Sequence, residues 1–145
     1  MRWTLFHEAA VKGHLEICQT IMWSLEISNF TDFHPRDDKG STPLHLAAAQ
    51  GQLETCRWMI YSLILNNVID INPRNHEGTT PLHLAVMNGQ IEVWKFMAII
   101  VDETNTEGGI NPKNNEGETP LHRAAHLGYL EIYCVIMSSL VHNQV

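Results

Sequence analysis

The sequence predicts an all-α solenoid of four stacked helix-turn-helix units, with β-hairpin loops joining one unit to the next. The fragment Thr-Pro-Leu-His occurs at 42–45, 80–83 and 119–122, and a degenerate copy, Thr-Leu-Phe-His, lies at 4–7. Consecutive copies begin 38, 38 and 39 residues apart. A fixed period of this size is the signature of a stacked array, in which each unit covers the apolar face of its neighbour. We therefore expect a single domain over 1–145, with units at about 1–36, 37–74, 75–113 and 114–145.

Each unit is predicted to open with a short helix that begins at the Thr-Pro pair. The threonine hydroxyl can accept a hydrogen bond from a free amide of the first turn, and proline at the first helical position leaves no amide unsatisfied. In the second unit this helix would run from Pro43 to Gln50. Gly51 can then adopt the left-handed conformation that ends a helix.

A longer second helix is predicted to follow the glycine directly. Its first turn contains an apolar residue followed by glutamate, a charge that suits the N-terminal end of a helix dipole. We expect it to end near Ser28–Asn29 in the first unit and near Asn66–Asn67 in the second, because asparagine tolerates a left-handed cap. The apolar residues at this end of the second unit are expected to enlarge the outer helical layer, and they are Leu63, Ile64, Val68 and Ile69.

Short polar segments separate the second helix of one unit from the first helix of the next. They are Asp37–Gly40, Asn75–Gly78 and Asn114–Gly117. A leading Asp or Asn, whose side chain bonds to the nearby backbone, and a closing glycine are typical of a type I turn. Each segment is therefore predicted to be the tip of a projecting hairpin.

This order of turn, short helix, glycine and longer helix resembles the ankyrin repeat, from about Trp3 to Leu140. The segment 40–51, Gly-Ser-Thr-Pro-Leu-His-Leu-Ala-Ala-Ala-Gln-Gly, resembles it at nearly every fixed position. The units are longer than the usual ankyrin unit of about 33 residues. The resemblance implies a repeat histidine that bonds to neighbouring backbone, at His7, His45, His83 and His122. We expect loss of His83 to destabilise the fold more than loss of His7, which lies in a first unit that frays.

Composition limits the classes of partner and the compartment. The formal net charge is −7, which argues against nucleic acid or an anionic membrane as the main partner, because both attract clustered Lys and Arg. The N-terminus lacks the apolar run of a signal peptide. Cys18 and Cys56 occupy equivalent positions in adjacent units, about 8–10 Å apart by helix packing, which is beyond the reach of a disulfide. Free thiols suit a reducing compartment, so we expect an intracellular, cytoplasmic location and leave a nuclear one open.

No sequence motif indicates catalysis or metal binding. A glycine-rich phosphate loop, a nucleophile elbow and paired metal-ligand spacings are absent from the sequence. His122 and His126 are four residues apart on a predicted helix, as zinc ligands often are, but no cysteine or carboxylate joins them. We therefore expect no metal, no cofactor and no enzymatic activity.

Positions that differ between units are the candidates for partner recognition, because constant positions build the stack. The resemblance implies that an ankyrin protein binds its partner through the hairpin tips and the concave surface of the inner helices. The predicted partner-binding set comprises Asp38, Lys39, Ser41, Ala49, Gln50, His76, Glu77, Thr79, Met87, Asn88, Asn115, Glu116, Glu118, His126 and Leu127. The alternative is that these residues vary only because they face solvent.

The predicted binding set favours one class of protein partner. Glu77, Glu116 and Glu118 give the last two tips an acidic bias, and Met87 and Leu127 lie beside them as apolar anchors. This pattern predicts a basic segment with one or two aliphatic side chains. Two other functions stay open: a regulatory ankyrin segment of a larger protein, such as a channel, a kinase or a ubiquitin-ligase adaptor, and a scaffold that self-assembles through poorly capped end repeats.

Overall fold

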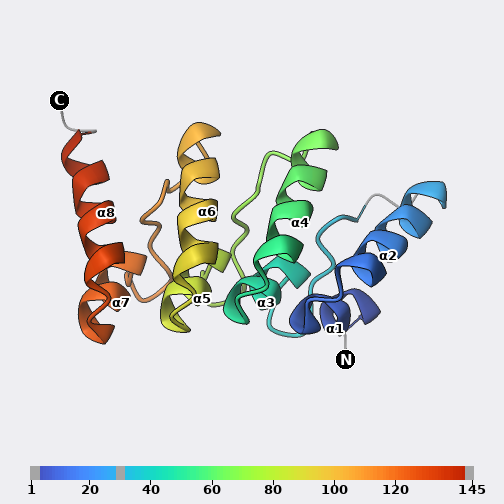
Figure 1. Ribbon diagram of the computed structural model, residues 1–145, viewed down its shortest axis with the longest axis horizontal. Coiled ribbons are helices and arrows are strands. Elements are labelled where there is room, and N and C mark those ends of the chain that lie inside the picture. The colour runs from blue at the N-terminus through green and yellow to red at the C-terminus, as the bar shows by residue number, and fades with distance from the viewer. Residues whose placement is uncertain (1–3, 29–31, 143–145) are drawn as a thin grey trace.

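The computed structural model describes residues 4–28 and 32–142, and these contain eight helices in four consecutive pairs. The short inner helices are α1 (Leu5–Lys12), α3 (Pro43–Ala49), α5 (Pro81–Met87) and α7 (Pro120–Leu127). The longer outer helices are α2 (Leu15–Ile27), α4 (Leu53–Leu65), α6 (Ile91–Glu103) and α8 (Leu130–His142). The outer helices stand side by side in chain order, with the inner helices along one edge of the row (Figure 1). The predicted all-α solenoid of four helix pairs is confirmed.

The inner helices begin at the Thr-Pro pair, as predicted. In α5, the hydroxyl of Thr80 accepts from the backbone amide of His83 at 3.4 Å, while the Thr80 amide donates to Nδ1 of the same histidine at 3.2 Å. The same reciprocal cap occurs at all four inner helices. Each cap pairs two amides that have no partner within the helix, and it thereby stabilises a helix of only two turns.

The glycine after each inner helix has a left-handed conformation, and in the first three units the following unit also approaches it closely. Gly51 has a φ of +73°, and a Cβ atom there would lie 2.2 Å from Oε1 of Gln90. Gln90 uses its side-chain amide to donate to the carbonyl of Ala49 at 3.4 Å. A side chain at position 51 would therefore strain the backbone and displace the side-chain amide of Gln90 from its bond to Ala49.

The outer helices extend about as far as the sequence predicts. Helix α4 ends at Leu65, and Asn67 adopts the left-handed conformation with a φ of 57°. Helix α2 ends at Ile27 with Ser28 as its cap, and the predicted Asn29 lies outside the described residues. The extra apolar residues were predicted wrongly in part, because Ile64 is 39% and Ile69 is 91% exposed. No element of the described chain covers these two side chains, so they do not enlarge the buried layer.

The core runs through the middle of the stack and is continuous from unit to unit. Small residues such as Ala10, Ala48 and Ala85 are fully buried in the inner helices and allow these helices to approach closely. Larger residues, including Ile60 and Trp94, fill the space between the outer helices and have no exposed surface. Burial of this apolar surface between units is the main term that holds the stack together.

The loops between units are fingers with tight turns, and they correct one detail of the prediction. The carboxylate of Asp37 accepts from the amides of Lys39 and Ser41, both at 2.8 Å, as predicted from its position in the turn. The Asp37 amide in turn donates to the carbonyl of Ser41 at 2.9 Å. Within residues 4–28 and 32–142 no segment forms a β-strand, so the fingers are not β-hairpins in the strict sense. A single closing bond between the two arms is too little to form a ladder.

The repeat histidine links each unit to the next one. Nε2 of His45 donates to the carbonyl of Thr79 at 3.0 Å, and His7 and His83 make the equivalent bonds to Ser41 and Glu118. Nδ1 accepts from the threonine amide, so the proton is on Nε2, the nitrogen that faces the next unit. Burial lowers the pKa of His45 to about 4, although its bond to the Thr79 carbonyl opposes that shift. The imidazole is therefore neutral, as this pair of bonds requires.

Candidate protein-binding groove

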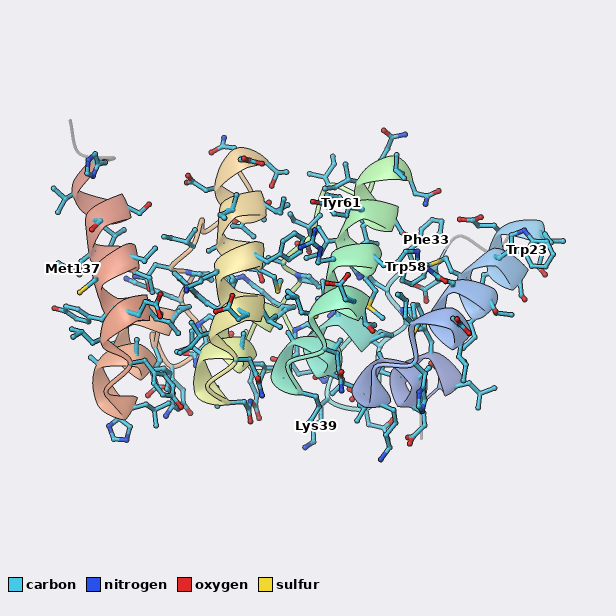
Figure 2. All side chains as sticks on the ribbon, in the orientation of Figure 1. Trp23, Phe33, Lys39, Trp58, Tyr61 and Met137 are labelled. Atoms are coloured by element: carbon cyan, nitrogen blue, oxygen red, sulfur yellow. The ribbon has the colours of Figure 1, made fainter. Side chains whose placement is uncertain are left out.

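A groove of about 420 Å³ lies between the first two fingers and the inner helices α3 and α5. Five residues of the predicted binding set line it, namely Asp38, Lys39, Ser41, Ala49 and Glu77. We call this hollow the finger groove. The finger that carries Lys39 lies at the edge of the molecule formed by the inner helices, away from the far ends of the outer helices (Figure 2). The finger groove is thus on the inner-helix side of the stack, the side on which the resemblance implies that a partner binds.

The floor of the finger groove is apolar, and two of its residues were missed by the sequence analysis. Leu46 and Leu84 are half-buried and line the groove from equivalent positions of α3 and α5. They belong to a Leu-His-Leu-Ala segment that occurs only in the second and third units, and the sequence analysis assigned neither of them a role in binding. One signal was available, since Leu46 is three residues before Ala49 and therefore lies on the same helical face.

The rim of the finger groove carries more negative than positive charge. Asp37, Asp38 and Glu77 lie there with a single cation, Lys39. The Asp37 carboxylate already accepts two backbone amides, which fixes its position in the turn. A cationic group entering the groove would therefore meet at least one carboxylate, that of Asp37, whose position is already fixed, so that binding orders fewer groups.

Several residues of the predicted binding set hold one unit or one finger against the next. Ser41 and Thr79 are each only 5% exposed, and their carbonyls accept from the repeat histidines of the preceding unit. The amide of His76 donates to the carbonyl of Lys39 at 3.0 Å, and the side-chain amide of Asn115 donates to the carbonyl of His76 at 2.9 Å. These bonds hold one finger against the next. We therefore correct the prediction for Ser41 and Thr79, whose side chains offer almost no surface to a partner.

The other predicted residues of the second and third units are exposed at the ends of the inner helices. Gln50 follows α3, and Asn88 follows α5 with its side-chain amide donating to the carbonyl of Leu84 at 2.8 Å. Met87 is the last residue of α5 and is 41% exposed. Since it follows Leu84 by three residues, it extends the apolar floor of the finger groove along the same helical face.

In the last unit the predicted residues do not line the finger groove. Glu116 and His126 are exposed, and Leu127 is 42% exposed. Glu118 forms an ion pair with Arg123, with Oε2 and Nη2 2.7 Å apart. This carboxylate is therefore less available to a partner than the sequence suggested.

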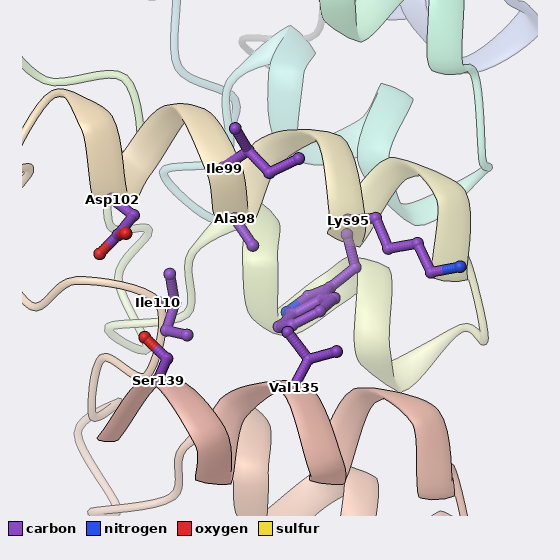
Figure 3. A pocket seen from close by; sticks show the side chains of 8 residues that line it. Lys95, Ala98, Ile99, Asp102, Ile110, Val135 and Ser139 are labelled. Carbon is purple, nitrogen blue, oxygen red and sulfur yellow. The ribbon is translucent and has the colours of Figure 1, made fainter. Parts of the chain in front are cut away.

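A second groove of about 410 Å³ lies on the outer-helix side, between α6 and α8. Side chains from the two helices face each other across it, with Lys95 and Asp102 toward opposite ends (Figure 3). The space exists because Ala98 occupies the position that Ile60 fills in the preceding unit. None of the predicted binding residues lies there.

Neither a membrane span nor a metal cluster is found in the part of the chain that the structure describes. None of its helices combines the length and apolar character needed to cross a bilayer. No three His, Cys, Asp or Glu side chains of residues 4–28 and 32–142 come together where they could hold a metal ion. His122 and His126 accordingly lack a third ligand.

The fold and the groove define a class of protein, the solenoids of stacked helix pairs that carry an open surface along one side. Within that class, the chain belongs to the ankyrin repeat family. A family model described as ankyrin repeats (many copies) matches residues 6–60, and one described as ankyrin repeats (3 copies) matches residues 59–144. No curated protein matches the chain. Ankyrin repeats generally serve as protein-interaction modules, and these matches identify no catalytic domain.

Proposed function

We propose that the chain is a non-catalytic recognition module that binds a partner protein in the finger groove. The observation that carries this proposal is the pairing of an apolar floor, formed by Leu46 and Leu84, with a rim that contains Asp38 and Glu77. An apolar floor gives binding energy through desolvation, and fixed charges at the rim select the partner and its orientation. Both come from rigid elements, which reduces the ordering cost of binding.

The partner that suits this groove is a basic segment with one or two aliphatic side chains. An aliphatic side chain would cover Leu46 and Leu84, and a neighbouring Lys or Arg would approach Glu77. The net charge of −7 over the whole chain favours the approach of a cationic segment from a distance. Met87, at the end of α5, offers a second apolar contact further along the same face.

Selection from a random peptide library on the immobilised protein tests this proposal. The selected peptides should be enriched in Lys or Arg beside Leu, Ile, Val or Met, and their affinity should fall as salt concentration rises. Glu77→Lys should weaken them by roughly tenfold or more, as expected when an attractive charge contact becomes repulsive. Ala49→Arg should abolish binding by filling the groove.

The matched control is Glu54→Lys, which makes the same change of net charge on the exposed first turn of α4, outside the groove. It should leave the affinity nearly unchanged. Peptides that bind the Ala49→Arg variant as well as the wild type would place the interaction elsewhere. Equal losses for Glu77→Lys and Glu54→Lys would mean that only long-range attraction is involved.

A further inference from the structure

The side of the fourth unit that faces away from the third carries apolar residues at positions that the other units bury. Tyr133, Met137 and Leu140 are 38%, 36% and 37% exposed. In the third unit the equivalent residues are Trp94, Ala98 and Val101, which are 0%, 6% and 0% exposed. Met137 lies on the side of α8 away from α6, at one end of the row of helices (Figure 2). We call this surface of the fourth unit the trailing face.

The trailing face also has an unused hydrogen-bond donor. In the first three units, Nε2 of the repeat histidine donates to a carbonyl of the following unit. His122 keeps its local bonds to Thr119, at 2.8 Å from Nδ1 to the hydroxyl, but its side chain is exposed. No residue of the described chain lies opposite its Nε2 as an acceptor. The trailing face therefore presents exposed apolar side chains and a ring N–H, the two kinds of group that the internal interfaces of the stack use.

The first unit provides such a leading side. Ile17 and Ile21 of α2 occupy the positions of Ile132 and Ile136 in α8, where both side chains are fully buried against the third unit. Ile17, by contrast, is 50% exposed, and Leu5 at the start of α1 is 81% exposed. We call this surface of the first unit the leading face. It presents the same two isoleucines that the chain already uses to close its last internal interface.

A polar contact of the internal interfaces can also be reproduced. Gln52 and Gln90 each donate from their side-chain amides to a carbonyl of the preceding inner helix, that of Val11 and that of Ala49. His14 occupies the equivalent position in the first unit and is exposed. It has a ring N–H that could donate to the equivalent carbonyl of the fourth unit, that of His126.

We propose that the trailing face of one copy of this chain binds the leading face of a second copy. The contact repeats the packing of one unit on the next, with the side chains of Ile17 and Ile21 of the second copy against Tyr133 and Met137 of the first. Such a contact is heterologous, since two different faces meet, so each added copy presents a free trailing face. Assembly is open-ended, and the mean mass rises continuously with concentration.

Sedimentation velocity on the 145-residue chain tests this with two face-blocked variants. The trailing-face variant combines Tyr133→Lys and Met137→Lys, and the leading-face variant combines Leu5→Lys and Ile17→Lys. All four side chains are at least 36% exposed, so each variant should fold, with a circular dichroism spectrum like that of the wild type. The wild type should grow beyond dimers between micromolar and near-millimolar concentration, while each variant alone stays at the monomer mass of 16.5 kDa.

A mixture of the two variants gives the decisive result. One keeps a free leading face and the other a free trailing face, so an equimolar mixture should form one-to-one dimers and nothing larger. Trp23→Lys is the control, because Trp23 is 63% exposed on an outer helix but belongs to neither face. It should assemble as the wild type does.

Two results would overturn the proposal. A wild type that stays monomeric at every concentration would show that the faces do not bind each other. A leading-face variant that still dimerises would indicate a symmetric contact between two trailing faces. Both face-blocked variants should keep their affinity for peptides of the finger groove, so failure of this proposal can be told apart from failure of the proposed recognition function.

Discussion

The second and fourth units carry the same Thr-Pro-Leu-His motif, yet they differ in what that motif contributes to the protein. In the second unit, His45 is fully buried and bonds to the third unit, and Ile60 on the adjacent outer helix is fully covered. In the fourth unit, His122 is exposed and Met137, at the position of Ile60, is 36% exposed. The local helix cap is the same in both units. The motif therefore specifies the local geometry of one unit. Burial against the following unit, and the hydrogen bond to it, supply the contacts that stabilise the folded state.

The largest expected difference between the two regions is in apolar packing. Ile60→Ala removes buried methylene groups between α4 and α6 and should lower the free energy of unfolding by about 2–5 kcal/mol. Met137→Ala, at the same position in the fourth unit, should change it by less than about 1 kcal/mol, because the side chain is already partly in water. Urea denaturation at low micromolar concentration, where self-association is minimal, measures both. Similar losses would show that the fourth unit is covered in solution.

The next difference concerns the repeat histidine. His83→Ala leaves the buried amide of Thr80 without its acceptor, and it removes the bond to the Glu118 carbonyl, which still accepts from the amide of Asn114. This change should cost about 1–3 kcal/mol. His122→Ala removes only local capping bonds to Thr119 and should cost less. The same denaturation measurement applies, and the expected order is contradicted if the two losses agree within error.

This comparison also replaces one made from the sequence. We expected loss of His7 to destabilise the fold less than loss of His83, because the first unit would fray. The structure shows that His7 is fully buried and bonds to the carbonyl of Ser41 at 3.0 Å. Since the histidine faces the following unit, the first unit is well supported on that side. The weakly held histidine is His122, at the other end of the stack.

The features that the sequence predicted well are those determined by contacts within a few residues. The Asp37 turn, the threonine caps and the left-handed Asn67 all follow from local side-chain chemistry. Register between copies then gave the order of the helices, because equivalent residues must repeat the same local structure. These parts of the fold required no knowledge of the neighbouring units.

The features that were missed depend on what lies opposite a residue in space. Ser41 and Thr79 vary between units, which suggested a binding role, but the histidine of the preceding unit covers them. Leu46 and Leu84 were not considered for binding, but both line an open groove. Ile69 is apolar and yet 91% exposed. Periodicity identifies the helix face of a residue, but it does not say whether another element covers that face.

Acid should reveal the buried histidine of the second unit. An unfolded histidine has a pKa of about 6.5, and burial lowers that of His45 to about 4. Between these values the unfolded chain binds more protons, so stability is complete above about pH 6.5 and is lost as pH falls toward 4. From pH 7 to pH 5 this histidine should account for a loss of roughly 2 kcal/mol. Burial also lowers the pKa of His83, which adds a loss in the same direction.

The measurement is urea denaturation at several pH values between 7 and 5, where most carboxylates are still ionised. His45→Gln, which cannot titrate, should show a smaller loss of stability over this range than the wild type. His122→Gln is the matched control at the same place in the last unit, and it should reduce the loss less than His45→Gln does. If the free energy of unfolding depends on pH equally in the wild type and in His45→Gln, protonation of His45 is not coupled to unfolding.

Thiol reactivity measures the same difference in burial between the inner units and the last unit, and it requires no substitution. Cys18 and Cys56 lie where the next unit covers them, and burial raises their pKa to about 11 and about 12. The thiolate is the reactive form, so both should react with a disulfide reagent only as the protein unfolds. Cys134 is exposed and should react at once. An absorbance assay should therefore count one fast thiol per folded chain and three after denaturation.

A double substitution applies the same assay to the trailing face. Tyr133→Cys, made together with Cys134→Ser, places a thiol at the position that Cys56 occupies in the second unit. Because Tyr133 is 38% exposed, a thiol at its position should react fast in dilute protein, whereas Cys56 at the equivalent position of the second unit is buried. If a second copy covers the trailing face, the reaction should slow as protein concentration rises, because association removes the open form by mass action. A rate that is fast at every concentration would mean that the face stays open, and a slow rate in dilute protein would mean that it is already covered within one chain.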